Sequence, residues 1–262
     1  MRDLHARRSM AQIVAIILAV IVQIGATFLP ALGFGENIGS RSDDIQTLIT
    51  PSGWAFSIWG PLFFGSACYA IWQALPAQRG NALLGKIGWW SAGALAARGV
   101  WAVYTQGAAL TAVSALIILA SLVCLLVIMR AVAGLHRVMT TAERWLVGLL
   151  FTALAAWLTA ASIVNISAAL VYHGADFGAA EAMITAAVVV VGGCIASLAI
   201  SRSRGAPYYA LVFLWALLAI YFRGGQEAPA VAYASIAAAI LVAATSILRL
   251  ADPANRRFWT GW

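Results

Sequence analysis

The stretch that decides the fold runs from Pro51 to Gln73 and reads PSGWAFSIWGPLFFGSACYAIWQ. It opens with Pro-Ser-Gly, a combination typical of turns. No charged residue occurs from Trp54 to Trp72, and about 20 apolar residues are enough to cross a bilayer. Small residues recur at every fourth position: Gly53, Ser57, Pro61 and Gly65. Because such a stripe lets a second helix pack closely, we expect a membrane helix with one small face and otherwise aromatic surroundings.

Composition extends this expectation to the whole chain. Hydrophobic residues make up 63% of it and charged residues only 10%, which leaves too little polar surface for a soluble domain of this size. The net charge of +7 does not indicate nucleic-acid binding, because the basic residues lie at helix ends rather than in one patch. The three cysteines lie in apolar runs without metal-ligand spacing, so we interpret them as core residues: Cys68, Cys124 and Cys194.

The apolar runs predict an all-α integral membrane protein, a bundle of about eight transmembrane helices. The expected spans are 11–33, 54–72, 83–104, 108–132, 145–171, 181–200, 207–222 and 229–250. The first run is longer than the ~7–15 apolar residues of a secretory signal, so we interpret it as a spanning helix. The alternating pattern of a membrane barrel is absent.

The distribution of charge tests this count independently. With the N-terminus in the cytoplasm, thirteen of the sixteen basic residues fall on the cytoplasmic side, and only Arg41 and Arg223 fall on the other. The acidic residues show the reverse bias. The positive-inside rule therefore predicts that both termini are cytoplasmic, and we expect the bacterial inner membrane as the location. Losing one helix would destroy this separation.

One positive charge, Arg98, lies in the interior of a predicted span. A charge near the bilayer centre costs at least ~2.5 kcal/mol, so it usually faces a cavity or a partner. Trp101 lies three residues after Arg98 on the same helix face, and Trp90, eleven residues before Trp101, also shares that face. Two interpretations stay open: Arg98 snorkels or pairs with a carboxylate for structural reasons, or it faces an aromatic cavity.

A second polar group, Asn165, lies in the fifth predicted helix. Trp157, Ala161 and Asn165 are spaced four residues apart and form one broad face. A single asparagine in a membrane helix often only bonds one helix to another. Its combination with a tryptophan and small residues makes a pocket wall an equally good interpretation.

Three motifs together resemble the TspO/MBR family, the tryptophan-rich sensory proteins that include the peripheral-type benzodiazepine receptor or translocator protein. The family's second helix begins with P-P-x-W-x-F-G-P-x-W-x-x-L-Y, and the matching residues here are Pro51, Gly53, Trp54, Phe56 and Leu62, with the second tryptophan one place early at Trp59. The N-x-x-W of its third helix corresponds to Arg98-Gly-Val-Trp101, with arginine in place of asparagine. Its fifth-helix pattern is matched by Trp157, Leu158, Thr159, Ala161 and Asn165. The resemblance covers about residues 10–173, and longer members of the family add three helices.

This resemblance implies a five-helix TspO-like core over residues 1–173, followed by three additional helices and a short tail over 174–262. It also implies a cavity for a flat hydrophobic ligand, such as a porphyrin or haem, with a sterol or carotenoid as the other class. The expected ligand-binding residues are Trp54, Phe56, Trp59, Trp90, Arg98, Trp101, Trp157, Ala161 and Asn165. Arg98 would pair with a carboxylate such as a porphyrin propionate.

The function implied is membrane sensing or binding, with a regulatory or transport role in tetrapyrrole or pigment metabolism. No nucleophile–base pair, HExxH, P-loop or paired carboxylates occur in the helices, so we favour a non-enzyme with no required cofactor and no metal. A small-molecule transporter and an assembly subunit of a larger membrane complex remain the alternatives. The expected partners are the bilayer, a hydrophobic ligand and a second copy or another membrane subunit, but not nucleic acid.

Overall fold

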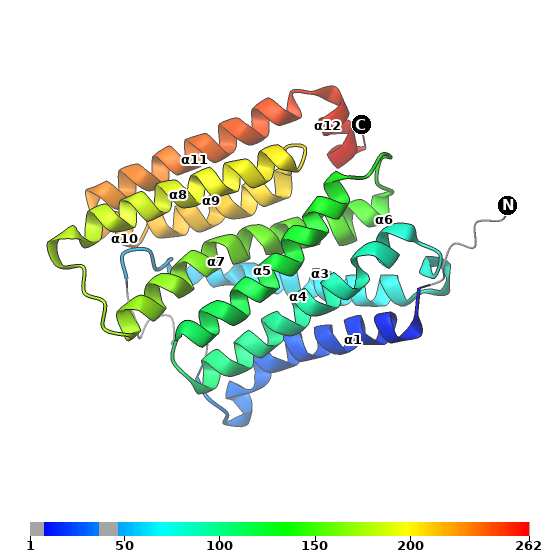
Figure 1. Ribbon diagram of the computed structural model, residues 1–262, viewed down its shortest axis with the longest axis horizontal. Coiled ribbons are helices and arrows are strands. Elements are labelled where there is room, and N and C mark those ends of the chain that lie inside the picture. The colour runs from blue at the N-terminus through cyan, green and yellow to red at the C-terminus, as the bar shows by residue number, and fades with distance from the viewer. Residues whose placement is uncertain (1–7, 37–46, 262) are drawn as a thin grey trace.

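The computed structural model describes residues 8–36 and 47–261, which form helices and no strand (Figure 1). The long helices are α1 (Met10–Gly25), α3 (Trp59–Ala74), α4 (Ala82–Gly107), α5 (Ala112–Ala133), α7 (Leu150–Tyr172), α8 (Glu181–Arg202), α9 (Pro207–Tyr221) and α11 (Pro229–Leu250). Three short helices are α6 (Thr141–Glu143), α10 (Gly224–Glu227) and α12 (Pro253–Thr260). The predicted all-α fold class is confirmed. Several charges used above lie outside the described residues: Arg2, Asp3, Arg7, Arg41, Asp43 and Asp44.

Two predicted helices differ from the structure near one end of the bundle. The first ends as an α-helix at Gly25 and continues as 3₁₀ turns at Ala26–Phe28 and Pro30–Leu32. Pro30 has no N–H to donate to the preceding turn, so the α-helical hydrogen bonds cannot continue through it. The second begins with a 3₁₀ segment, η3 (Gly53–Ile58), before α3 starts at Trp59. This 3₁₀ start changes which aromatic side chains share a face.

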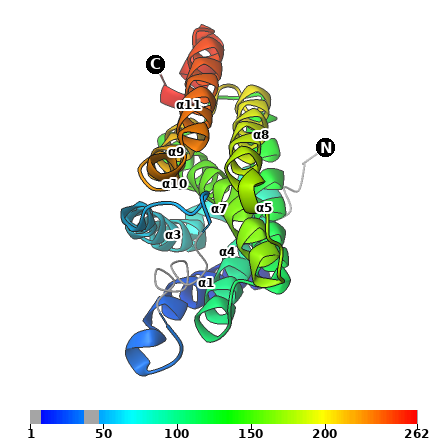
Figure 2. The ribbon, with the colours of Figure 1, turned by 90° about the vertical axis from the view of Figure 1, so that its left-hand side faces the viewer.

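Helix α7 lies at the centre of the bundle, as the end-on view in Figure 2 shows. Fifteen of its 23 residues are buried, because α3, α5, α8 and α9 all pack against it. Helices α1 and α4 extend the bundle beyond α3 and α5, and α11 covers α8 and α9. The small stripe of α3 meets this core at Gly65, where a Cβ atom would lie 3.0 Å from Cδ1 of Leu150.

Seven helical stretches within the described residues are long and apolar enough to cross a membrane. The remaining long helix, α4, has 26 residues but carries Lys86 and Arg98, which lower its hydropathy. It packs side by side with α1 and α5, as expected for a helix of the same bundle. The chain is therefore an integral membrane protein, and the count of eight crossings stays a prediction for α4.

The two ends of the bundle differ in charge. The chain enters α1 and leaves α11 at the same end (Figure 1). That end carries most of the described basic residues: Arg8, Arg79, Lys86, Arg130, Arg137, Arg144, Arg202, Arg204, Arg249, Arg256 and Arg257. Glu36, Asp176, Glu181 and Glu227 belong to the opposite end. We refer to these as the basic end and the acidic end. Assignment of the basic end to the cytoplasm remains a prediction from the positive-inside rule.

The last three long helices pack directly against the predicted five-helix core. The Ser52 backbone N–H and hydroxyl both donate to the carbonyl of Ala219 in α9, at 3.1 Å each. The Trp215 indole N–H donates to the carbonyl of Ala55 in η3, also at 3.1 Å. Helix α9 therefore contributes to the surroundings of η3 and α7, although the division at residue 173 stays a prediction.

Candidate functional site

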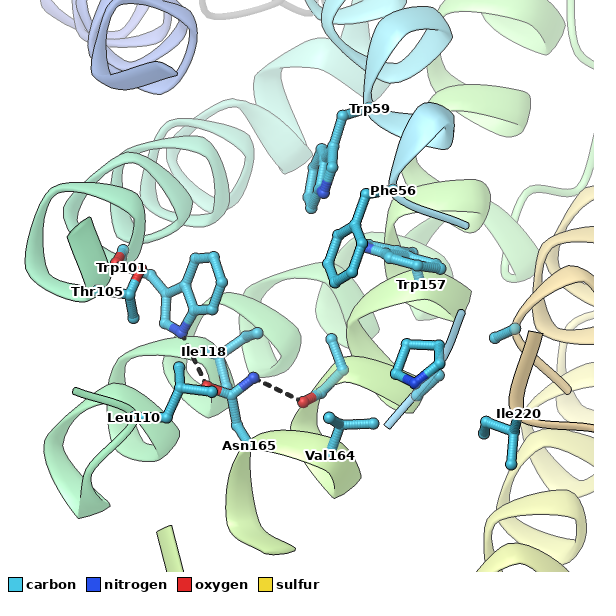
Figure 3. A pocket seen from close by; sticks show the side chains of 14 residues that line it. Phe56, Trp59, Trp101, Thr105, Leu110, Ile118, Trp157, Val164, Asn165 and Ile220 are labelled. Atoms are coloured by element: carbon cyan, nitrogen blue, oxygen red, sulfur yellow. Dashed lines mark hydrogen bonds between the residues drawn. The ribbon is translucent and has the colours of Figure 1, made fainter. Parts of the chain in front are cut away.

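A cavity lies between η3, α4, α5, α7 and α9, close to the acidic end (Figure 3). Its lining is almost wholly apolar or aromatic. The lining residues are Pro51, Phe56, Trp59, Trp101, Thr105, Leu110, Ile118, Trp157, Ala160, Ala161, Val164, Asn165, Ala216 and Ile220. Six of the nine residues expected to bind a ligand lie in this lining: Phe56, Trp59, Trp101, Trp157, Ala161 and Asn165.

Three aromatic rings form one wall of the cavity. Phe56 and Trp59 are three residues apart across the end of η3, where the Trp59 backbone N–H donates to the Phe56 carbonyl. A 3₁₀ turn brings side chains at i and i+3 onto one side, so both rings point toward α7. Their centroids lie 6.0 Å and 6.2 Å from that of Trp157, in edge-to-face arrangements. The wall is thus made of large faces suited to a flat apolar molecule.

The polar groups of the opposite wall bond to one another. The Trp101 indole N–H donates to Oδ1 of Asn165 at 3.1 Å, and Nδ2 of Asn165 donates to the Ala161 carbonyl at 2.9 Å (Figure 3). Asn165 thereby fixes the orientation of the Trp101 ring. The two interpretations left open for Asn165 both apply, because it links α4 to α7 and also lines the cavity.

Arg98 is not among the residues that line the cavity, but it packs against two tryptophans that are. Its guanidinium carbon lies 3.9 Å from the ring centroid of Trp59 and 4.6 Å from that of Trp101. The side chain is 2% exposed, and within the described residues Nε, Nη1 and Nη2 have no hydrogen-bond partner. The predicted aromatic surroundings of this cation are therefore present. Neither snorkelling to the surface nor a pairing carboxylate is seen among the described residues.

The structure corrects the expected placement of Trp54 and Trp90. The Trp54 ring is 41% exposed and packs edge-to-face on Trp215, 4.6 Å away, because the 3₁₀ turn directs it away from Phe56 and Trp59. Trp90 is 43% exposed, whereas Trp101 on the same face of α4 is 5% exposed. Asn165 of α7 bonds to Trp101, which lines the cavity, whereas Trp90 lies outside the lining.

A comparison with known protein families identifies one that matches most of the chain. The family described as TSPO-like protein matches it over residues 9–248. The chain belongs to the TSPO-like family. No curated protein and no solved structure matched it. The match includes α8, α9 and most of α11 in addition to the first five long helices.

Sequence reasoning missed the contribution of two helices to the cavity of this TSPO-like protein. Ala216 and Ile220 of α9 close one side, and Ile118 of α5 with Leu110 just before it closes another. These residues are common apolar types without a distinctive spacing, so no local signal marks them. The resemblance also directed attention to the first 173 residues, whereas α9 follows them.

The cavity is nearly filled by its own side chains. About 50 Å³ is open to water-sized molecules, far less than the ~300–1,000 Å³ typical of a ligand pocket. A tetrapyrrole would therefore require movement of the lining rings. Phe56 and Trp59 are only partly buried, so of the three wall rings they have more freedom than Trp157 to move.

Proposed function

We propose that this TSPO-like membrane protein binds a flat, apolar ligand that carries a carboxylate, of the porphyrin or haem type, and senses or transports it. The observation that carries the proposal is the guanidinium of Arg98, held against the rings of Trp59 and Trp101 without a hydrogen bond among the described residues. A buried cation in this state is costly, and an anionic ligand group would offset the cost.

A second buried polar group supports the same interpretation. Both side-chain atoms of Gln23 in α1 are buried and lack hydrogen-bond partners within the described residues. Helix α1 passes closely over α4 at Gly99, the residue after Arg98, where a Cβ atom would lie 2.8 Å from Val22. The region where α1 crosses α4 thus has unused donors and an acceptor, although neither Gln23 nor Arg98 is among the residues that line the cavity. This combination favours a ligand that is apolar over most of its surface and charged at one edge.

Binding of such a ligand would couple to movement of η3. The ring faces of Phe56 and Trp59 must separate from Trp157 to admit a planar macrocycle, and η3 is bonded to α9 through Trp215. Opening the cavity would shift η3 relative to α9. This coupling offers a route from ligand binding to a signal or to a transport step.

Titration of the purified protein with protoporphyrin IX and with its dimethyl ester tests the proposal. Arg98→Gln should weaken the free acid by ~1.5–3 kcal/mol, roughly 10- to 150-fold, since it removes a charge-assisted hydrogen bond. The ester should bind wild type and variant about equally. Arg79→Gln removes one exposed positive charge outside the cavity and serves as the matched control.

Three outcomes separate the alternatives. If both porphyrins lose the same affinity in Arg98→Gln, the arginine supports the cavity wall and not the ligand. If Arg79→Gln weakens the free acid equally, the attraction is a property of overall charge. If neither porphyrin binds the wild type, the tetrapyrrole proposal fails and the transporter or assembly-subunit alternative takes its place.

A further inference from the structure

A groove opens between α5 and α8 at the basic end of the bundle, away from the cavity described above. Its volume is about 470 Å³, and its walls carry Arg130 and Arg202 together with the apolar residues Leu126, Met129 and Ala199. Helices α5 and α8 both pack against α7 but not closely against each other. Figure 2 shows the two helices along the same side of the bundle. The groove is therefore formed by α5 and α8 together with the first residue that follows each of them.

The two arginines in the groove are free to bind a ligand. Arg130 lies in the last turn of α5 and Arg202 in the last turn of α8, and both are exposed. Neither side chain makes a hydrogen bond or ion pair within the described residues. Two guanidinium groups with unused donors on facing walls match the oxygens of a phosphate group.

A third arginine at this end has a structural role and fixes the geometry of the groove. Arg204 donates from Nε to the Ala133 carbonyl at 2.9 Å and from Nη2 to the Leu135 carbonyl at 2.8 Å. These bonds tie the chain that leaves α8 to the chain that leaves α5. The mouth of the groove, and with it the pair of free arginines, is thus held in place by the protein itself.

The lining changes from charged to apolar with depth along the helices. Leu126 precedes Arg130 by one turn, and Ala199 precedes Arg202 by about one turn, so both lie nearer the middle of the bundle. Basic side chains at the helix ends with an apolar channel behind them correspond to the head group and acyl chain of a phospholipid. A soluble phosphate compound has no apolar chain that could fill the apolar part of the groove.

We propose that the groove between α5 and α8 binds an anionic phospholipid of the leaflet at the basic end. Its phosphate lies between Arg130 and Arg202, and an acyl chain follows Leu126 and Ala199. An arginine beside an anionic head group attracts it, and two arginines in contact with the same lipid should together raise its affinity about 30-fold. The groove adds a defined site to this general attraction, because it holds both charges beside a channel that opens toward the hydrocarbon core.

The test is thermal stabilisation of the full chain in a neutral detergent by added lipid. Phosphatidylglycerol should raise the unfolding temperature at lower concentrations than phosphatidylcholine with the same acyl chains. In the double variant Arg130→Gln/Arg202→Gln the concentration of phosphatidylglycerol required should rise about 30-fold. The matched control is Arg256→Gln/Arg257→Gln, which removes the same charge from exposed positions of α12 at the same end. This control should respond like the wild type.

Each remaining outcome overturns the proposal. Equal loss in both double variants would show attraction to overall charge without a site. Equal stabilisation by phosphatidylcholine would show that the head-group charge is not recognised. Equal stabilisation by inorganic phosphate would show an anion site without a lipid. Ala199→Phe, which narrows the apolar channel and leaves both arginines, should also weaken phosphatidylglycerol, and an unchanged response would exclude the acyl-chain part.

Discussion

Two buried arginines at different depths of the bundle have opposite surroundings. Arg8, at the basic end, is 7% exposed and donates to Oε1 of Gln12 at 2.8 Å, to the Gln73 carbonyl at 2.8 Å and to Oε1 of Gln73 at 2.7 Å. Arg98, at 2% exposed, lies against the faces of two tryptophans and has no hydrogen-bond partner among the described residues. The first charge is bonded by the protein, whereas the second retains its full capacity to bind.

This difference separates a structural role from a binding role. Each hydrogen bond to a charged group contributes ~1.5–3 kcal/mol, so the bonds of Arg8 tie α1 to α3 near the membrane surface. Cation–π contact with a desolvated ring contributes ~2 kcal/mol and leaves the N–H groups unsatisfied. A buried arginine without acceptors is therefore the more informative of the two about a ligand.

The largest effect is expected where the bonds of Arg8 are broken. Gln73→Ala removes one acceptor of Arg8 and leaves its charge partly unpaired, and Gln73 itself is fully buried. We expect the free energy of unfolding to fall by about 3 kcal/mol, measured by denaturation in detergent. Gln226→Ala, at an exposed position, is the control and should change it by less than about 0.5 kcal/mol. Equal effects would mean that Arg8 finds other acceptors.

A smaller loss is expected at the hydrogen bond that orients the cavity wall. Asn165→Ala leaves the indole N–H of Trp101 without its acceptor. Hydrogen bonds between membrane helices contribute about 0.6 kcal/mol on average and up to about 1.7, so we expect a loss of about 1 kcal/mol. The Trp101→Phe/Asn165→Ala double variant tests the pairing, because it should lose less than the sum of the single variants. Additive losses would show that the bond contributes nothing.

These cases also show how far the sequence predicts the structure. The eight long helices were predicted from runs of apolar residues, because each run is a local feature of the sequence and is about as long as a membrane-spanning helix. Only part of the cavity lining was predicted from the sequence. Ala216 and Ile220 line the cavity because α9 packs against α7, and the sequence of α9 contains no pattern that indicates this packing. Trp54 was misplaced because an α-helical period was assumed where the chain forms a 3₁₀ turn. Trp90 was misplaced because a shared face does not reveal which part of the face is covered.

A change of opposite sign is expected at Arg98. Arg98→Leu removes an unsatisfied buried charge and two cation–π contacts together, and these terms nearly cancel. We expect the ligand-free protein to be unchanged or stabilised by up to about 1 kcal/mol. The measurement is the one used for Gln73→Ala. If the free energy of unfolding fell by about 3 kcal/mol, Arg98 would have a structural role like that of Arg8, and the contrast between the two arginines would be wrong.

The smallest effect is expected at Trp90, and it defines where the aromatic interior ends. Trp90 and Trp101 share a face of α4, but only Trp101 lines the cavity. Trp90→Ala should therefore change porphyrin affinity by less than about twofold, whereas Trp157→Ala removes the central ring of the wall and should weaken it about tenfold or more. Fluorescence quenching by the porphyrin measures both.

Because Trp90 faces outward and α1 and α5 cover the neighbouring faces of α4, a ligand bound in the cavity cannot reach it without displacing Trp101. A tenfold loss in Trp90→Ala would show that the ligand lies along the outer face of α4 and not between α4 and α7.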